Sequence, residues 1–177
     1  ILDFAKNNKK LIKFVYFSTD EVFGPAPKGI KYDEDDRYKS GNPYAASKAG
    51  AEEMCMAYEN TFKLPIIISH TMNVFGERQH PEKFIPKIIN ASTFNKIITI
   101  HSNKNKTKAG SRFYIYAGDV ADAIMFLIKK GKSGQKYNIV GSKEIDNLTL
   151  AKFINKILKN KIKYKMVDFH SARPGHD

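Results

Sequence analysis

The chain has 177 residues, 42% of them hydrophobic, and a formal net charge of +12, as expected for one globular domain with a substantial core. Its longest apolar run, around Ile66-Ile67-Ile68, is far too short to span a membrane, so no membrane partner is expected. The single cysteine, Cys55, excludes an internal disulfide framework and favours a reducing, cytoplasmic location.

The positive charge has three interpretations. Clustered lysines would indicate a nucleic-acid protein, but here the lysines are scattered among acidic residues, as at Lys9, Lys10, Lys13 and Lys31. A solvated Lys-rich surface explains the pattern better, and no nucleic-acid partner is predicted. A positive field would also attract a small diphosphate substrate.

Residues 1–9 are predicted to be the last turns of a helix, with Lys9 at the end that favours cations. The chain then starts within an element, which suggests a fragment. A poorly alternating apolar run predicts a strand over 13–18 that is buried on both faces. Polar side chains follow at its carboxyl end, where open α/β sheets bind their ligands: Ser18, Thr19, Asp20 and Glu21.

A loop rich in proline, glycine and charge follows over 24–42, either as a lid or as a plain connection. Asn42-Pro43 is typical of a helix start, with Asn as the N-cap, and this helix is expected to run to about Phe62. A second buried strand is predicted over 65–71, with its polar end at Asn73.

The second half continues to alternate helices and strands. This order predicts an α/β fold with a largely parallel sheet. The expected elements are a helix opening at Pro86, a strand over 96–101, a basic loop over 102–111, a strand over 112–117, a helix capped by Asp119, a strand over 137–140, a helix over 148–159 and a strand over 163–167.

Tyr44 and Lys48 lie four residues apart and therefore share one face of the predicted helix. On its own this spacing also fits a half-buried tyrosine beside a solvated lysine. In the functional interpretation the phenol acts as a base, because a neighbouring ammonium favours the phenolate. A hydroxyl from Thr19 or Ser18 would then orient the substrate oxygen.

These motifs together resemble the extended short-chain dehydrogenase/reductase superfamily, which acts on nucleotide sugars. The resemblance rests on Ser18-Thr19, Tyr44-x-x-x-Lys48 and Asn73-Val74-Phe75-Gly76, and the stretch Thr19–Gly24 narrows it to the nucleoside-diphosphate-glucose 4,6-dehydratases. It implies the C-terminal part of a Rossmann-like, doubly wound parallel sheet with a smaller α/β substrate-binding region. Residues 1–80 would be the catalytic part of the NAD-binding domain. Residues 81–177 would mainly bind substrate, with some elements returning to the sheet.

The resemblance also implies a reaction. Members of this family oxidise C4 of the hexose, eliminate water across C5 and C6, and return the hydride to C6. Tyr44 would take the 4-hydroxyl proton, Glu21 would take the C5 proton, and Asp20, kept protonated, would protonate the departing 6-hydroxyl. Two adjacent carboxyls repel each other when both are ionised, which helps one stay protonated. Alone, the pair would fit a solvated turn.

Further roles carried over from the family concern the cofactor NAD, the nucleoside-diphosphate hexose and a homodimer. His101 could contact the nucleotide or simply pack in its strand, and the five histidines show no metal-ligand spacing, so no metal is predicted. The residues implied to bind NAD are Ser18, Tyr44, Lys48 and Asn73, and those implied to bind substrate are Thr19, Asn73, Lys83, Arg112, Asn138, Arg173 and His176.

The chain departs from the family mildly at Phe23 and Val74, and more clearly in three other ways. Ala172 stands where an acidic residue is common, the basic 102–111 loop is long, and no Gly-x-x-Gly-x-x-Gly turn occurs to cradle the NAD pyrophosphate. The last point suggests the C-terminal part of a longer enzyme, inactive in isolation. Two alternatives remain: another NAD-dependent epimerase or decarboxylase of the superfamily, or a non-catalytic, truncated nucleotide-binding domain.

Overall fold

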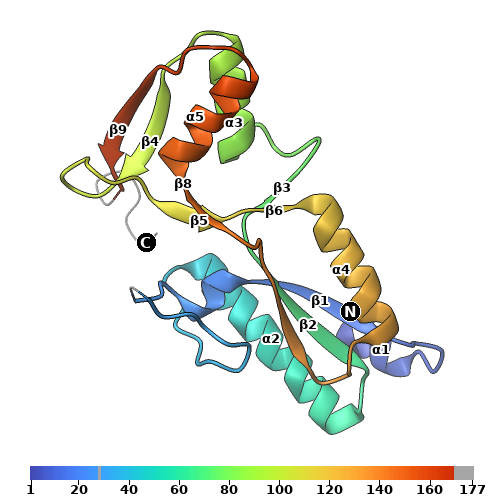
Figure 1. Cartoon of the computed structure of the whole chain (residues 1–177). Coiled ribbons are helices and arrows are strands. Elements are labelled where there is room, and N and C mark those ends of the chain that lie inside the picture. The colour runs from blue at the N-terminus through green and yellow to red at the C-terminus, as the bar shows by residue number, and fades with distance from the viewer. Residues whose placement is uncertain (28, 170–177) are drawn as a thin grey trace. The chain divides into compact units, whose positions relative to one another are not determined.

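The computed structural model describes residues 1–27 and 29–169, and these form two compact units (Figure 1). Unit 1 consists of Ile1–Met72 and Gly118–Val140. Unit 2 consists of Asn73–Ala117 and the described residues from Gly141 onward. The sequence places one division at residue 80, with later elements returning to the sheet. In the structure, the later segment that lies in unit 1 is 118–140.

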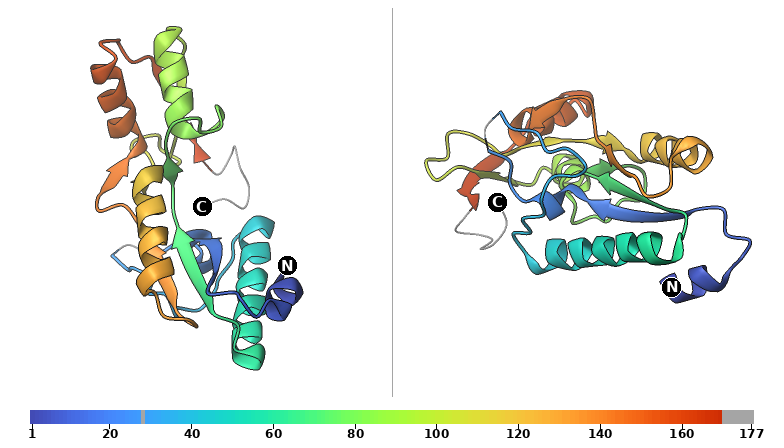
Figure 2. Two further views of the ribbon diagram at one scale, coloured as in Figure 1. Left: turned by 90° about the vertical axis from the view of Figure 1, so that its right-hand side faces the viewer. Right: turned by 90° about the horizontal axis from the view of Figure 1, so that it is seen from below.

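Unit 1 is built on a parallel three-stranded sheet. Its strands are β1 (Phe14–Thr19), β2 (Ile66–Thr71) and β7 (Lys136–Ile139), in the order β1-β2-β7. Helices α1 (Leu2–Asn7) and α2 (Pro43–Phe62) lie on one face of the sheet, and α4 (Ala117–Lys130) lies on the other (Figure 2). This confirms the expected α/β class with parallel strands.

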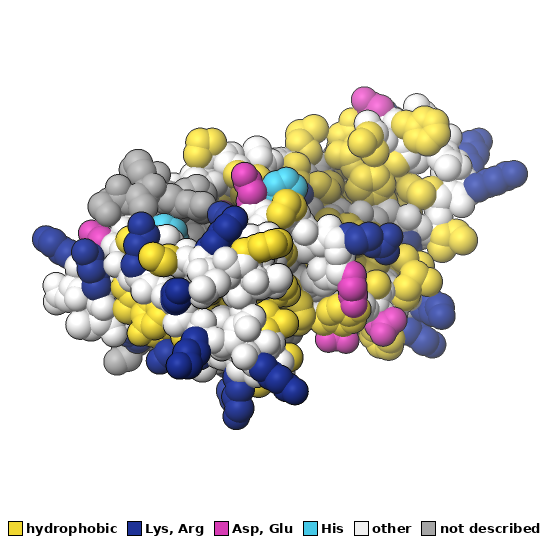
Figure 3. Space-filling model, turned by 90° about the horizontal axis from the view of Figure 1, so that it is seen from above, with side chains coloured by type: hydrophobic (Ala, Val, Ile, Leu, Met, Phe, Trp, Pro, Cys, Tyr) yellow, Lys and Arg dark blue, Asp and Glu magenta, His cyan; other side chains and the backbone are white. Residues whose placement is uncertain are grey.

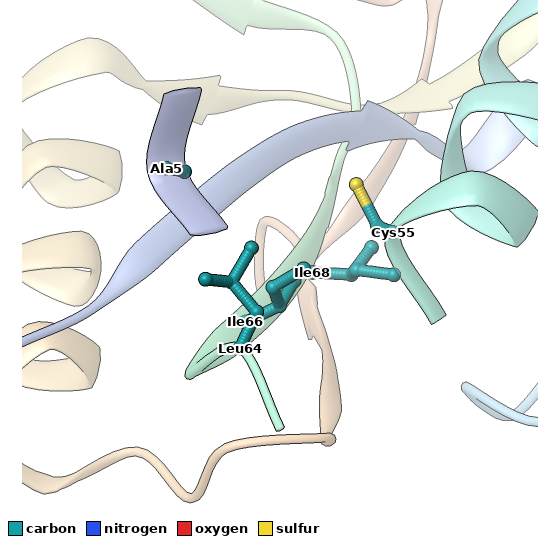
Figure 4. Close-up of a cluster of buried hydrophobic side chains, with 5 residues drawn as sticks. All are labelled: Ala5, Cys55, Leu64, Ile66 and Ile68. Atoms are coloured by element: carbon teal, nitrogen blue, oxygen red, sulfur yellow. The ribbon is translucent and has the colours of Figure 1, made fainter. Parts of the chain in front are cut away.

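Burial on both faces explains the apolar run in β2. Ile66 and Ile68 join Ala5, Cys55 and Leu64 in a cluster under α1 and α2 (Figure 4). Ile67 points to the opposite face, because successive strand residues alternate, and it is 0% exposed. The next residue on the α2 face is polar: His70, which pairs in register with Ser18 on β1 and with Asn138 on β7.

The ends of α2 are where the sequence predicts them. The Asn42 side chain accepts a hydrogen bond from the Ala45 N–H at 2.9 Å, and Pro43 occupies the first turn. After Phe62, Lys63 adopts the left-handed conformation (φ 54°), which ends the helix. Between β1 and α2 lie a short 3-10 helix, η1 (Asp20–Phe23), and the 24–42 loop.

Unit 2 holds two helices that pack together, α3 (Phe84–Thr93) and α5 (Asn147–Ile157). Its core contains Ile88, Ile98, Ile100 and Ala151. Three two-stranded pairings complete the unit: β4 (Ile98–Ser102) with β9 (Tyr164–Asp168) and β3 (Val74–Phe75) with β6 (Ile115–Tyr116), both parallel, and β5 (Ser111–Phe113) with β8 (Glu144–Asp146), antiparallel.

Two sequence predictions in this half are wrong. Residues 112–117 do not form one strand, because the chain changes partner at Tyr114, from β8 to β3. Gly141 packs against Tyr114 so closely that a Cβ at Gly141 would lie 2.0 Å from the Tyr114 carbonyl oxygen. Asp119 does not cap the following helix but lies within its first turn, since α4 begins at Ala117. None of the helices among the described residues is long and apolar enough to cross a bilayer.

Candidate active site

Thr19 organises the carboxyl end of β1. Its side chain is 7% exposed. The Oγ1 atom donates to Asp20 Oδ1 at 3.3 Å and accepts from the Glu21 N–H at 3.3 Å, so it also caps η1. One hydroxyl thereby contacts both acidic residues, and the tight η1 turn keeps them at the end of the strand. Asp20 is half-buried and Glu21 is exposed.

Asn42 connects this turn to the start of α2. Its Nδ2 donates to Glu21 Oε2 at 3.0 Å, while its Oδ1 caps the helix. Tyr44 follows two residues later and is 52% exposed, which leaves its ring accessible to a ligand. One asparagine thus links the Glu21 carboxylate on η1 to the first turn of α2, which carries Tyr44.

Lys48 lies one turn further along α2 and is directed at β1. Its Nζ donates to the Phe17 carbonyl oxygen at 2.6 Å and lies 4.7 Å from the centroid of the Tyr16 ring. The ammonium therefore sits beside the strand that ends in Thr19. The structure brings the predicted catalytic residues Thr19, Asp20, Glu21, Tyr44 and Lys48 onto neighbouring, packed elements of unit 1.

Ser18, predicted to bind the cofactor, is 5% exposed and donates its hydroxyl to Glu52 on α2. Glu52 in turn faces His70, whose Nε2 lies 3.0 Å from Glu52 Oε2. Neither residue was identified from the sequence. Two signals could have found them: Glu52 continues the four-residue spacing of Tyr44 and Lys48, and His70 interrupts a buried strand.

Asn138 and Asn73, two predicted ligand contacts, lie in different units. The Asn138 side chain is within 3.1 Å of His70 Nδ1, and its backbone N–H donates to Glu34 at 3.0 Å. Asn73 has a φ of 43°, a left-handed conformation that asparagine tolerates better than most residues. It turns the chain from β2 into β3.

The other predicted substrate contacts fall in unit 2 or beyond the described residues. Lys83 is exposed at the start of α3, and Arg112 on β5 donates to the Ser111 carbonyl at 2.8 Å. Arg173 and His176 lie outside the described residues. The His101 ring packs edge-on against Phe169. Within the described part of the chain, no group of three His, Cys, Asp or Glu side chains could hold a metal ion.

Comparison with known proteins identifies the family. The model of the NAD dependent epimerase/dehydratase family matches residues 1–140. The chain belongs to this family. The match agrees with the superfamily resemblance read from the strand end at Thr19 and the Tyr44/Lys48 pair.

Two individual proteins similar to this epimerase/dehydratase chain are named as dehydratases. The chain is 43% identical over 160 residues to dTDP-D-glucose 4,6-dehydratase of Dictyostelium discoideum, covering 83% of this chain and 35% of that protein. It is 36% identical over 181 residues to the human dTDP-D-glucose 4,6-dehydratase, covering 100% of this chain and 50% of that one. The chain thus spans half or less of these relatives.

A solved structure agrees with the fold. The dTDP-glucose 4,6-dehydratase of Bacillus anthracis, crystallised with NAD, superposes with a TM-score of 0.80 at 30% identity, covering 88% of this chain and 50% of that one. The fold of this epimerase/dehydratase chain therefore matches the Rossmann-like fold of that dehydratase.

Proposed function

We propose that the protein is a nucleotide-sugar 4,6-dehydratase, a hydro-lyase that converts dTDP-glucose or UDP-glucose to the 4-keto-6-deoxy sugar. The observation that carries this proposal is the pair Asp20 and Glu21, both tied to Thr19 at the end of β1 and linked to the start of α2. The similarity to proteins named dTDP-D-glucose 4,6-dehydratase supports it.

The residues of unit 1 fit the reactive end of NAD. Tyr44 is exposed at the amino end of α2, and the Lys48 ammonium lies beside the last residues of β1, so both can reach a ligand at the end of this strand. When bound there, NAD would supply the hydride acceptor for oxidation at C4 and the hydride donor for reduction at C6. The glycine-rich turn that cradles the pyrophosphate is not part of this chain.

The side chains divide the proton transfers. Tyr44 takes the proton of the 4-hydroxyl, and Thr19 orients that oxygen. The resulting 4-keto group acidifies the C5 hydrogen, which Glu21 removes as the base. Asp20 donates a proton to the departing 6-hydroxyl, so that one water leaves and a C5–C6 double bond remains. Glu21 then returns its proton to C5 as the hydride is delivered to C6, which gives the 4-keto-6-deoxy sugar. The proposal thus gives the acid role to the half-buried Asp20 and the base role to the exposed Glu21.

Unit 2 supplies a positive surface for the diphosphate. Exposed lysines occur at Lys104, Lys106 and Lys108 in the loop after β4, and Figure 3 shows Lys and Arg side chains spread over the face drawn there. Arg112 offers a planar guanidinium that matches phosphate oxygens. Lys83, Asn73 and Asn138 complete the proposed contacts to the substrate within the described residues.

We further propose a homodimer formed through α1 and α2. Phe4 and Met54 on these helices are 78% and 53% exposed, and an apolar hollow of about 440 Å³ between α1, β1 and α2 is lined by Leu2, Met54 and Tyr58 among others. Exposed apolar surface of this kind marks interfaces. Light scattering should give twice the monomer mass.

The cytoplasmic location stays a prediction.

A 4-epimerase is the second candidate. The UDP-glucuronic acid 4-epimerase of Bacillus cereus, crystallised with NAD, has a TM-score of 0.85 to this chain at 25% identity, covering 94% of this chain and 52% of that one. The fold therefore suits both reactions. An epimerase needs no acid and base for eliminating water, so Asp20 and Glu21 favour the dehydratase.

The test uses the full-length protein with NAD and either dTDP-glucose or UDP-glucose. We expect a product lighter by one water and bearing a 4-keto group, whereas a C4 epimer of unchanged mass would indicate the second candidate. Glu21→Gln should reduce turnover by about 100- to 10,000-fold yet still allow reduction of bound NAD, since C4 oxidation precedes the step it blocks. Glu53→Gln, an exposed site on α2, is the control.

A further inference from the structure

Glu52 is a carboxylate in the interior of unit 1. It is 0% exposed. Three donors from three elements meet it: the Ser18 hydroxyl on β1, the Tyr38 hydroxyl in the 24–42 loop and the His70 ring on β2, whose Nε2 lies at 3.0 Å. Burial disfavours the charged form, but these hydrogen bonds outweigh it and hold the pKa of Glu52 below its ordinary value. The pocket is built around a negative charge.

The hydrogen bonds around His70 determine how many protons its ring carries. Asn138 Nδ2 donates to the Tyr32 carbonyl oxygen at 3.4 Å, and a carbonyl can only accept, so Asn138 Oδ1 must face the ring. This oxygen lies 3.1 Å from His70 Nδ1, while Nε2 faces the Glu52 carboxylate. Both ring nitrogens therefore face acceptors, and an imidazolium, with a proton on each nitrogen, satisfies both contacts.

The charged and titratable groups around the ring are compatible with an imidazolium. Burial, together with the hydrogen bond to Glu52, raises the pKa of Tyr38, so its hydroxyl stays a donor. Lys136 on β7 donates to that hydroxyl at 2.9 Å, and Glu34 accepts from the Asn138 N–H. From η1, the Phe23 ring packs edge-on with its centroid 4.9 Å from that of His70. Glu53 and Asp35 also act on Tyr38 by their charge, so an imidazolium at His70 would lie in a mainly acidic surrounding.

We propose that Glu52 and charged His70 form a buried ion pair that positions the reactive end of β1. Glu52 holds the Ser18 hydroxyl, and Ser18 precedes Thr19, which contacts both Asp20 and Glu21. In-register pairing of Ser18 with His70 fixes the same point from β2. Glu52 is a positioning residue, because it acts through Ser18. Its effect on turnover rests on the proposed function, but the charge of His70 does not.

The first test is spectroscopic and independent of activity. Nitrogen-15 NMR of the histidine side chains in the full-length protein, with His70 assigned through a His70→Gln variant, should show protons on both ring nitrogens at pH 7. Glu52→Gln should remove one of them, and Glu53→Gln, the exposed neighbour, should remove none. The ion pair is overturned if the His70 ring of the wild type carries only one proton. It is also overturned if the ring keeps both protons in Glu52→Gln.

The second test measures turnover. Glu52→Gln should lower kcat by about 10- to 100-fold with KM changed less than about twofold, because misplacement of the reacting groups, rather than substrate binding, is affected. Unchanged kcat overturns the positioning role. If Glu52→Gln fails to fold, Ser18→Ala is the deciding variant. It removes the hydrogen bond between Ser18 and Glu52 but leaves the Glu52–His70 pair intact. It should therefore lower kcat and keep both protons on the His70 ring. A wild type without dehydratase activity refutes the proposed function and leaves the NMR result standing.

Discussion

The amide of Asn42 donates to the carboxylate of Glu21 at 3.0 Å while its oxygen caps α2. One side chain therefore performs two tasks that can be separated by substitution. The cap stabilises the helix, whereas the amide holds the proposed base in place.

Asn42→Ser keeps a capping oxygen and loses the amide donor. We expect its free energy of unfolding to stay within about 0.5 kcal/mol of the wild type and its turnover to fall about 5- to 10-fold as Glu21 loses its partner. Asn42→Ala should lose the same turnover and about 1 kcal/mol of stability in addition. Thermal unfolding measures the effect on stability, and initial rates measure the effect on turnover. Equal turnover in Asn42→Ser and the wild type would contradict the role of the Asn42 amide in holding Glu21.

Gly24 closes the catalytic turn in a conformation that excludes side chains. Its φ is 72°, and a Cβ there would lie 2.3 Å from the Lys39 carbonyl oxygen. Gly24→Ala should destabilise the protein by more than about 1 kcal/mol and reduce turnover, because the turn carries Glu21. Gly29 has a φ of 82° in open space, so Gly29→Ala measures the conformational cost alone. Equal losses in chemical denaturation would exclude the clash as the cause.

Stability should fall in acid because of Glu52. Its pKa lies below the ordinary value of 4.5, so its ionised form contributes stability above that pH and loses it as the pH falls through the lower pKa of the folded protein. Unfolding by urea between pH 6 and pH 3 should show this loss in the wild type and in Glu53→Gln. The loss of stability should be smaller in Glu52→Gln. An identical pH dependence in all three proteins would refute the assignment of this loss to Glu52.

Asn155 offers a stabilising substitution in unit 2. It is 2% exposed, and its Oδ1 has no hydrogen-bond partner, although its Nδ2 donates to the Ala151 carbonyl at 2.9 Å. Asn155→Leu removes the unsatisfied acceptor and should stabilise the protein by about 1 kcal/mol. Asn160→Leu should destabilise it instead, since that side chain donates to Ser92. Differential scanning calorimetry distinguishes the two, and a lower Tm for Asn155→Leu would disprove the expectation.

Elements with local signals were predictable from the sequence. Asn42-Pro43 identifies the start of α2, and the apolar runs at β1 and β2 identify buried strands, because caps and continuous apolarity act over a few residues. The break at Tyr114 was not predictable. It depends on Gly141, which is distant in the sequence, and on β3 and β6, each two residues long.

The residues of the candidate site likewise fall into those that the sequence predicted and those that it did not. Tyr44, Lys48 and the acidic pair were predicted from spacing and resemblance. The Glu52–His70 pair was not, because a buried polar contact depends on which strand lies beneath the helix. Only the register of β1, β2 and β7 aligns Ser18, His70 and Asn138 in one row.

The order of the strands in unit 1 has a consequence for how the chain folds. β7 is made long after β2, yet it pairs with β2, and all the residues of β3 to β6 are synthesised in between. During translation the β2 edge therefore stays unpaired until its non-local partner has been made, and Asn138 reaches His70 only when β7 pairs with β2. Because closing so long a loop is slow, we expect the ring of His70 to become protected late, when β7 docks. Pulsed hydrogen exchange during refolding would then report β1–β2 pairing before β2–β7 pairing.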